Sequence, residues 1–440
     1  MINKNSYKQR KRERKELSEH NYVPTLKKSN VMNKKTSILL KLLYEGKIET
    51  RDLPSSSGFD TINNYFRNHK LDKNLKQEFY NLLLCLSKKK SEKLLRDKNY
   101  VNAIFYIAKL SDIWINDVKK WTPKSHNIEK QFSELLRYIF TKYPVPIFMN
   151  SAWYDESEKY IKWFLHIGSG KNIRTAENLP VKFTKKMAHC FLTAPDNYSI
   201  IEAIRWAQIK GLGGDELLVK SINETKIGRA FGNEDFWITV IHFFVYNSMI
   251  DRVHINPIID YIQNQKFEKQ RLAIDRGVFT YQEPPQSGFS MKGRTANALL
   301  VAVDNWHKAL SNTKKRKVLH IWEPFKISDF KLKTGKDSGT KTYRICQLLT
   351  STELTAEGRD MGHCVSSYIG SCSAGRSSIW SLTIEDFVGN IKKLVTIEVD
   401  RSNVICQIKG KHNRSPETNE ISIIKKWSTK EGLKLSRWVV

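Results

Sequence analysis

Side chains that can transfer protons gather near the C-terminal end of the chain. A histidine, His363, follows Met361 and Gly362, and a carboxylate (Glu398) and an amide (Gln407) occur in the segments after it. A histidine can take or give a proton near neutral pH, and a carboxylate or amide can orient it or the substrate. The candidate catalytic residues of this segment are His363, Glu398, Gln407, Tyr368, Asn413, Ser381 and Cys364.

A helix from about residue 360 must position the histidine, after a first helical turn that Ser351 or Thr352 can cap and that Gly358 interrupts. Its apolar positions recur at i, i+3, i+4 and i+7, which predicts a buried stripe. The members of this stripe are Met361, Cys364, Val365, Tyr368 and Cys372. This spacing favours Cys364 as a small core residue. It places His363 on the flank of the stripe, facing a cleft, and a merely structural histidine is the alternative.

Three strands should follow, at residues 378–384, 394–399 and 403–409, because apolar and polar residues alternate there. Gly389-Asn390 and residues 400–403 supply the turns of an antiparallel meander. In the expected register, Ser381, Glu398 and Gln407 share one face of the sheet. Such a polar row either faces solvent or belongs to a functional site. A closing helix through Trp427 should follow the third strand.

The predicted fold class is α+β and predominantly helical, with a small C-terminal module of a helix packed on an antiparallel meander. Helical spacing of apolar residues runs through most of residues 36–275, and a break near 145–150 allows two subdomains. The predicted domains are a basic arm (1–35), this helical region (36–275), a linker and helix (276–320) and the α+β module (321–440).

The charge of the chain predicts an anionic partner. Lysine and arginine total 74 against 45 acidic residues, a formal net charge of +29. Such an excess attracts polyanions, so nucleic acid is the first candidate partner and an anionic membrane surface the second. The basic arm has too few apolar residues to fold alone. The candidate nucleic-acid-binding residues are Arg10, Lys11, Arg12, Arg14, Lys15, Lys314, Lys315, Arg316, Lys317, Lys411 and Arg414.

The six cysteines do not indicate a finger or ribbon zinc site, since none are spaced as C-x-x-C. A zinc-binding structural module is still an alternative, with irregularly spaced ligands at His363, Cys364, Cys372, Cys406 and His412. We predict no metal residues beyond that alternative, and the sequence identifies no cofactor. The longest apolar segment, residues 237–250, is too short to span a bilayer, and no signal peptide is visible, which favours the cytoplasm.

The C-terminal segment resembles the PcfJ-like family, strongly over residues 320–430. The resemblance lies in E-G-x-x-M-x-H-C-V-x-x-Y, then G-x-x-x-I-x-S-L, then T-I-E, then Q-x-x-G-x-x-N-R, which begin at Glu357, Gly375, Thr396 and Gln407. It implies an association with conjugative plasmids and other mobile elements, and components of a DNA-processing complex would be the protein partners in that setting. It assigns no catalytic role to any residue.

Three hypotheses therefore stand beside each other. The protein acts on or near nucleic acid in DNA transfer or maintenance, or its C-terminal module is an enzyme for phosphodiester or nucleotide-transfer chemistry, or that module binds zinc. A nucleic-acid-binding protein would lose affinity steeply with salt, because each neutralised phosphate releases counterions. The reaction and the substrate cannot be read from these residues.

Overall fold

A computed structural model describes residues 36–48, 53, 57–89, 91–154, 157–275, 278–312, 320–335, 337–363, 365–436 and 439. They fall into two compact units, one within Met1–Leu179 and Leu192–Ile200 and the other within Pro180–Phe191 and Ile201–Val440. The candidates Cys364, Arg10, Lys11, Arg12, Arg14, Lys15, Lys314, Lys315, Arg316 and Lys317 lie outside the described residues. The predicted domain boundaries remain a prediction.

The first unit is helical. Its α-helices are α3 (Thr36–Tyr44), α4 (Gly58–Arg67), α5 (Lys73–Lys88), α6 (Lys98–Lys109), α7 (Ile128–Phe140) and α8 (Glu158–Gly168), with short 3-10 helices at Glu92–Arg96, Ser111–Ile113, Val118–Lys120, Ile147–Trp153 and Ile173–Thr175. In α5, Asp72 accepts a hydrogen bond from the backbone N–H of Leu75, which caps the first turn. Leu82, Leu83 and Leu86 are buried on one face of that helix, as their spacing predicts.

Helices also form the first part of the second unit. They are α9 (Lys185–Leu192), α10 (Ile200–Leu212), α11 (Glu216–Asn223), α12 (Lys226–Arg229), α13 (Glu234–Tyr246), α14 (Ile255–Lys266) and α15 (Ala296–Asn312). Between α14 and α15, β1 (Gln270–Asp275) and β2 (Val278–Gln282) pair as an antiparallel hairpin, which the helical spacing did not predict. No helix in the described part of the chain is long and apolar enough to cross a membrane.

A six-stranded sheet follows, in the order β3-β4-β5-β6-β7-β8. Its strands are β3 (Phe330–Thr334), β4 (Lys341–Leu348), β5 (Ser377–Glu385), β6 (Ile391–Asp400), β7 (Val404–Gly410) and β8 (Lys434–Leu435). All neighbouring pairs are antiparallel except β7 with β8. The predicted fold class is confirmed, and the three predicted strands lie within β5, β6 and β7.

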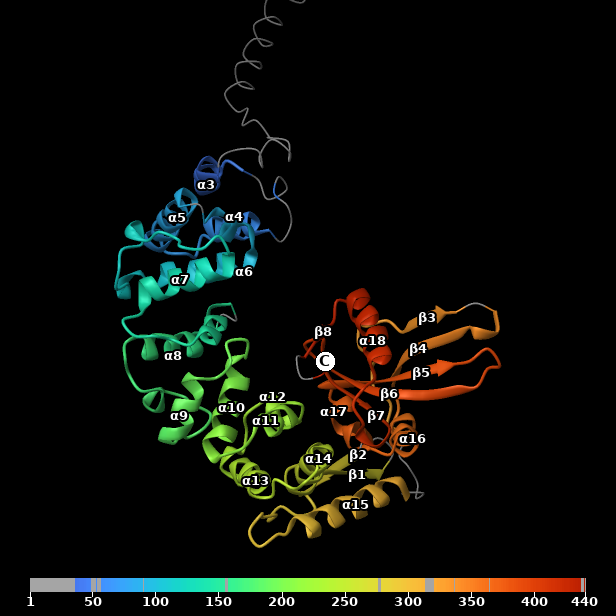
Figure 1. Ribbon diagram of the computed structural model, residues 1–440. Coiled ribbons are helices and arrows are strands. Elements are labelled where there is room, and N and C mark those ends of the chain that lie inside the picture. The colour runs from blue at the N-terminus through green and yellow to red at the C-terminus, as the bar shows by residue number, and fades with distance from the viewer. Residues whose placement is uncertain are drawn as a thin grey trace, which may run out of the picture. The chain divides into compact units, whose positions relative to one another are not determined.

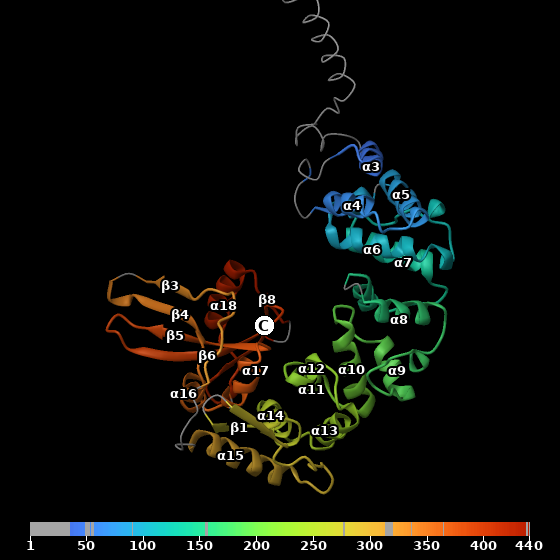
Figure 2. The same ribbon diagram turned by 180° about the vertical axis from the view of Figure 1, so that it is seen from behind.

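Helices cover both faces of this sheet (Figures 1 and 2). On one face, α18 (Thr418–Glu431) buries Ile424 and Trp427 against Trp380 and Ile397. On the other face, α16 (Ser351–Met361), a 3-10 turn (Val365–Tyr368) and α17 (Ile369–Ser373) pack near Ile379. The sheet residues on this second face are therefore enclosed by protein.

The predicted helix from about residue 360 is only partly observed, because the chain leaves the helical conformation at Gly362 and returns to it in the 3-10 turn Val365–Tyr368 and in α17. Thr350 and Glu353 form a capping box that opens α16, which continues through Gly358 to Met361. Gly362 then adopts a left-handed conformation (φ +64°), which ends the helix. A Cβ atom there would lie 2.6 Å from Nδ1 of His412, so both the backbone and the space favour glycine. The predicted burial of the stripe is observed at its described members, which are Met361, Val365, Tyr368 and Cys372.

Candidate functional site

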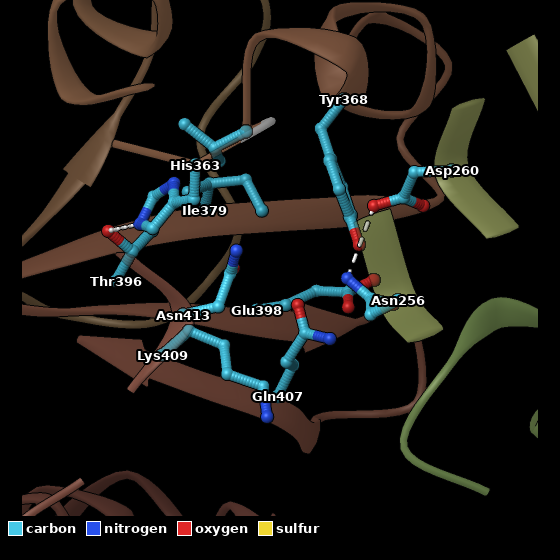
Figure 3. Close-up of a pocket in the computed structure, with 11 residues that line it drawn as sticks. Asn256, Asp260, His363, Tyr368, Ile379, Thr396, Glu398, Gln407, Lys409 and Asn413 are labelled. Carbon is cyan, nitrogen blue, oxygen red and sulfur yellow. Dashed lines mark hydrogen bonds between the residues drawn. The ribbon is translucent and has the colours of Figure 1, made fainter. Parts of the chain in front are cut away.

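A small polar pocket lies in the second unit, where the α16–α17 face of the sheet meets α14 (Figure 3). Its cavity volume is about 20 Å³, room for about one water molecule. The lining residues are Asn256, Asp260, His363, Val365, Tyr368, Ile379, Thr396, Glu398, Gln407, Lys409 and Asn413. Five of the predicted candidates, His363, Tyr368, Glu398, Gln407 and Asn413, are among them, and their chemical roles remain a prediction.

Strand register explains why the strand-borne candidates meet. Glu398 on β6 pairs directly with Gln407 on β7 and with Ile379 on β5. Side chains of directly paired residues lie on the same face of a sheet, so Glu398 and Gln407 are neighbours. Ser381 pairs with Thr396 one step further along the same face. Glu398 (5% exposed) and Ser381 (6% exposed) are buried, so exposure to solvent does not account for this polar row.

His363 is held by a chain of buried polar groups. Its Nε2 lies 3.0 Å from Oγ1 of Thr396, which donates to Oε1 of Glu357 at 2.7 Å. Glu357 is fully buried, and its other oxygen lies 2.8 Å from the ammonium of Lys393. The Thr396 hydroxyl donates its proton to Glu357, so towards His363 it can only accept a hydrogen bond, from Nε2–H. The lone pair of the neutral imidazole is therefore on Nδ1.

Burial sets the protonation state of this histidine. It lowers the pKa of His363 to about 4, against the opposing effect of the nearby Glu357 carboxylate. The imidazole is therefore neutral at pH 7. A neutral imidazole is the form that can accept a proton, and a negatively charged substrate brought next to it would raise its pKa again.

Glu398 is paired with a cation from the helical region. Its Oε2 lies 3.1 Å from Arg229 on α12, and its Oε1 accepts a hydrogen bond from Ser377 at 3.2 Å. Burial lowers the pKa of Arg229, but Glu398, Cys406 and Tyr368 together raise it by more, so the pKa stands above its ordinary value. Glu398 is thus paired with an arginine that no local pattern in the sequence singled out.

Two buried polar atoms around the pocket have no hydrogen-bond partner among the described residues. They are Nε2 of Gln407, a donor, and Oδ1 of Asn256, an acceptor. A buried donor or acceptor without a partner costs about 1–3 kcal/mol. A water-sized polar group in the cavity could bond to both, which makes the pocket suited to holding a reacting water molecule.

Helices upstream of the module complete the wall of the pocket. Asp260 on α14 lies 3.1 Å from the ammonium of Lys226, which stands 4.4 Å from the centre of the Tyr368 ring. Lys409 on β7 pairs with Glu224 at 2.9 Å. Sequence reasoning missed these residues, and the i, i+4 spacing of Asn256 and Asp260 on α14 was the only local signal for them.

Other candidates lie apart from the pocket. The buried hydroxyl of Ser381 has no partner among the described residues, although it lies on the pocket's side of the sheet. Lys411 is exposed just after β7. Arg414 donates to Glu420 at 2.6 Å and to the backbone carbonyl of Leu394 at 3.2 Å, so its guanidinium joins elements of the module.

The structure does not support the zinc alternative within the described part of the chain. No three His, Cys, Asp or Glu side chains there lie close enough together to hold a metal ion. Cys372 and Cys406 are buried, and burial raises the pKa of each thiol to about 12. Zinc binds the thiolate form, which this burial disfavours.

Comparison with known proteins identifies the C-terminal segment. Residues 286–424 match the family model described as PcfJ-like protein, which confirms the resemblance seen in the sequence motifs. The matched range holds the pocket residues carried by the sheet and by its α16–α17 face, and it excludes Asn256 and Asp260. No curated protein and no solved structure matches the chain.

Proposed function

We propose that this protein, whose residues 286–424 are PcfJ-like, acts on nucleic acid and that its C-terminal module hydrolyses phosphodiester bonds. The observation that carries the proposal is the convergence of His363, Glu398 and Gln407 on one small polar pocket. The net charge of +29 supports a polyanionic substrate. The association with mobile elements that the family resemblance implies remains a prediction.

In this mechanism His363 acts as the general base. A water molecule in the pocket attacks the phosphorus atom, and Nδ1 of His363 takes its proton. The P–O bond to the leaving oxygen breaks, and solvent protonates that oxygen. Glu357 and Thr396 hold the imidazole in the tautomer that this step needs, since Nε2 already carries its proton. Positioning of this kind commonly contributes to catalysis by keeping the base aligned.

Gln407 supports the charge that develops on the phosphate, and the Arg229–Glu398 pair supports the attacking water. The N–H of Gln407 that has no partner among the described residues can donate to a phosphate oxygen at the mouth of the pocket. Arg229 holds the Glu398 side chain in place through their ion pair, and the Glu398 carboxylate can orient the attacking water. The cavity is too small for a nucleotide, so the substrate must lie across its mouth while the water occupies its interior.

Incubation of the full chain with single-stranded DNA, duplex DNA and RNA tests the proposal. The wild-type protein should cleave at least one of them. His363→Ala should slow cleavage by about 10²- to 10⁴-fold, the usual contribution of a positioned acid or base. His126→Ala, at an exposed histidine of the first unit, is the matched control and should cleave at the wild-type rate.

Two results would count against hydrolysis. One is a wild-type protein that cleaves none of these strands, and the other is a His363→Ala protein that cleaves as fast as wild type. If the protein bound nucleic acid in a salt-dependent way but did not cleave it, we would conclude that it is a nucleic-acid-binding protein and that the pocket has another role.

A further inference from the structure

A larger groove lies elsewhere in the second unit, between α13 and the segment that leads into α15 (Figure 1). Its cavity volume is about 860 Å³. Sites for drug-sized ligands span roughly 300–1,000 Å³, so the groove has room for a nucleotide and part of a second one. Of the residues that line the small polar pocket, none lines this groove.

The floor of the groove is apolar and an aromatic ring stands at its edge. Phe243 and Met291 are each 8% exposed, and Ile238 is half-buried. Tyr246 is 84% exposed. His242 and Tyr246 are four residues apart on α13, so both rings lie along the same side of the helix. An exposed ring next to an apolar floor offers a flat surface for stacking.

Both charged side chains that line the groove, Lys292 and Arg294, are cationic. Arg294 is held in place, because its Nε donates to the carbonyl of Ser290 at 2.7 Å and its guanidinium lies 3.9 Å from the centre of the Phe289 ring. Gly293, with φ of +73°, makes the turn between the two cations. A fixed planar guanidinium matches the paired oxygens of a phosphate.

We propose that this groove binds a short single-stranded segment of nucleic acid. The bases lie against Tyr246 and the apolar floor, and the phosphates contact Arg294 and Lys292. In a duplex the faces of the bases are covered by their neighbours, whereas a single strand can present them to a protein ring. This inference rests on the proposed function, since it names the form in which the substrate is held.

Charge and ring chemistry favour this occupant over a peptide. An acidic amphipathic helix would also suit an apolar groove with cationic edges. The solvent-exposed ring of Tyr246 and the net charge of +29 fit a polymer that has a π-face and a phosphate in every residue. Binding of an acidic peptide is therefore the competing outcome of the test.

The test measures binding in the full chain carrying His363→Ala, so that the probe is not cut. Fluorescence anisotropy follows a labelled oligothymidylate of about 12 nucleotides, within the usual range of single-strand site sizes, and its duplex with oligoadenylate. Tyr246→Ala should weaken single-strand binding by about 5- to 100-fold, the effect of losing one stacked base. Lys292→Gln should reduce the slope of log affinity against log salt by about one.

Matched controls come from exposed positions away from the groove. Phe387→Ala removes a ring that is 65% exposed on the β5–β6 turn, and Lys425→Gln removes an exposed cation of α18. Both controls should bind the oligonucleotide like the parent protein. A 5-iodouracil at the centre of the probe should crosslink to Tyr246 or His242 when irradiated, as identified by mass spectrometry.

Three outcomes would overturn the groove proposal. The groove variants could bind like their controls, the duplex could bind as tightly as the single strand, or an acidic amphipathic peptide could lose affinity in Tyr246→Ala while the oligonucleotide does not. The proposed hydrolysis fails separately, in the cleavage assay. If the protein cleaves nucleic acid but the groove variants bind like their controls, only the groove proposal fails. If the groove binds the single strand but no cleavage occurs, only the proposed hydrolysis fails.

Discussion

Two arginine–glutamate pairs in the second unit differ in how completely their surroundings are hydrogen-bonded. Arg205 on α10 is fully buried and makes five hydrogen bonds, one for each of its N–H groups. Two go to Glu234, one to Gln208 and two to backbone carbonyls. Gln208 is also fully buried, and its amide bonds to both partners of the pair.

The second pair, Arg229 with Glu398, stands beside the small pocket. There Nε2 of Gln407 and Oδ1 of Asn256 are buried with no partner among the described residues. Native proteins leave few buried polar groups unpaired, and each such group destabilises the fold. The comparison indicates that the Arg205 network stabilises the fold. We propose that the unpaired groups beside Glu398 destabilise the fold and are kept because they bind a water molecule or a substrate.

The largest effect that separates the two networks should come from Arg205→Met. The substitution leaves the Glu234 carboxylate without its cation, and removal of one partner of a buried pair costs about 3–5 kcal/mol. Urea denaturation of the full chain measures the loss. Lys308→Met, which breaks an exposed ion pair with Asp304 on α15, is the matched control and should leave the denaturation midpoint unchanged. If Arg205→Met and Lys308→Met had the same denaturation midpoint, Arg205 would not be needed for the stability of the fold.

A smaller effect should appear in the pH dependence of stability. Burial lowers the pKa of His363 to about 4 in the folded chain, while an unfolded histidine titrates at its ordinary value of 6.5. Between these values the unfolded state binds more protons, so the contribution of His363 is favourable above pH 6.5 and is lost as pH falls towards 4. The loss amounts to at most about 3 kcal/mol.

His363→Gln should flatten this part of the stability curve. Unfolding free energies of the two proteins at pH 7, 6, 5 and 4 measure the difference, and His126→Gln controls for the removal of an imidazole. Parallel curves for wild type and His363→Gln would mean that the pocket does not hold a neutral imidazole. The same acid range should also reduce cleavage, since a protonated His363 cannot act as a base.

Local patterns were enough to predict the α+β class and the three central strands. Alternation with period two and the turns at Gly389 and Asp400 depend only on neighbouring residues. The end of α16 did not follow from spacing, because apolar residues continue at helical intervals past Gly362. The close approach of His412 to Gly362 requires the fold itself. The β1–β2 hairpin was missed for a similar reason, since helical spacing continued close to it.

The sequence was enough to predict which kinds of residue form the candidate site, but it identified only some of the individual residues. His363, Glu398 and Gln407 stood out because such groups are concentrated in one segment. Arg229 did not, because it lies 169 residues from Glu398 in the chain and nothing in its own segment points to a carboxylate. Long-range pairings of this kind depend on tertiary packing, which a single sequence does not display.

The smallest effect is also the most selective. Gln407→Met removes the buried N–H that has no partner among the described residues and keeps the length of the side chain. Removing an unpaired buried donor should leave the unfolding free energy unchanged or raise it by up to about 1 kcal/mol. Gln208→Met, the matched change in the Arg205 network, takes away paired groups and should lower it by about 1–3 kcal/mol. Urea denaturation of both variants gives the two values.

Cleavage should respond in the opposite order. Gln407→Met should lose about 10²- to 10³-fold in rate, as when one donor to a developing charge is removed, while Gln208→Met should cleave normally below its denaturation midpoint. A Gln407→Met protein that is destabilised as much as Gln208→Met would show that Gln407 is a structural partner. The distinction between a network that stabilises the fold and one that is kept for a ligand would then no longer hold.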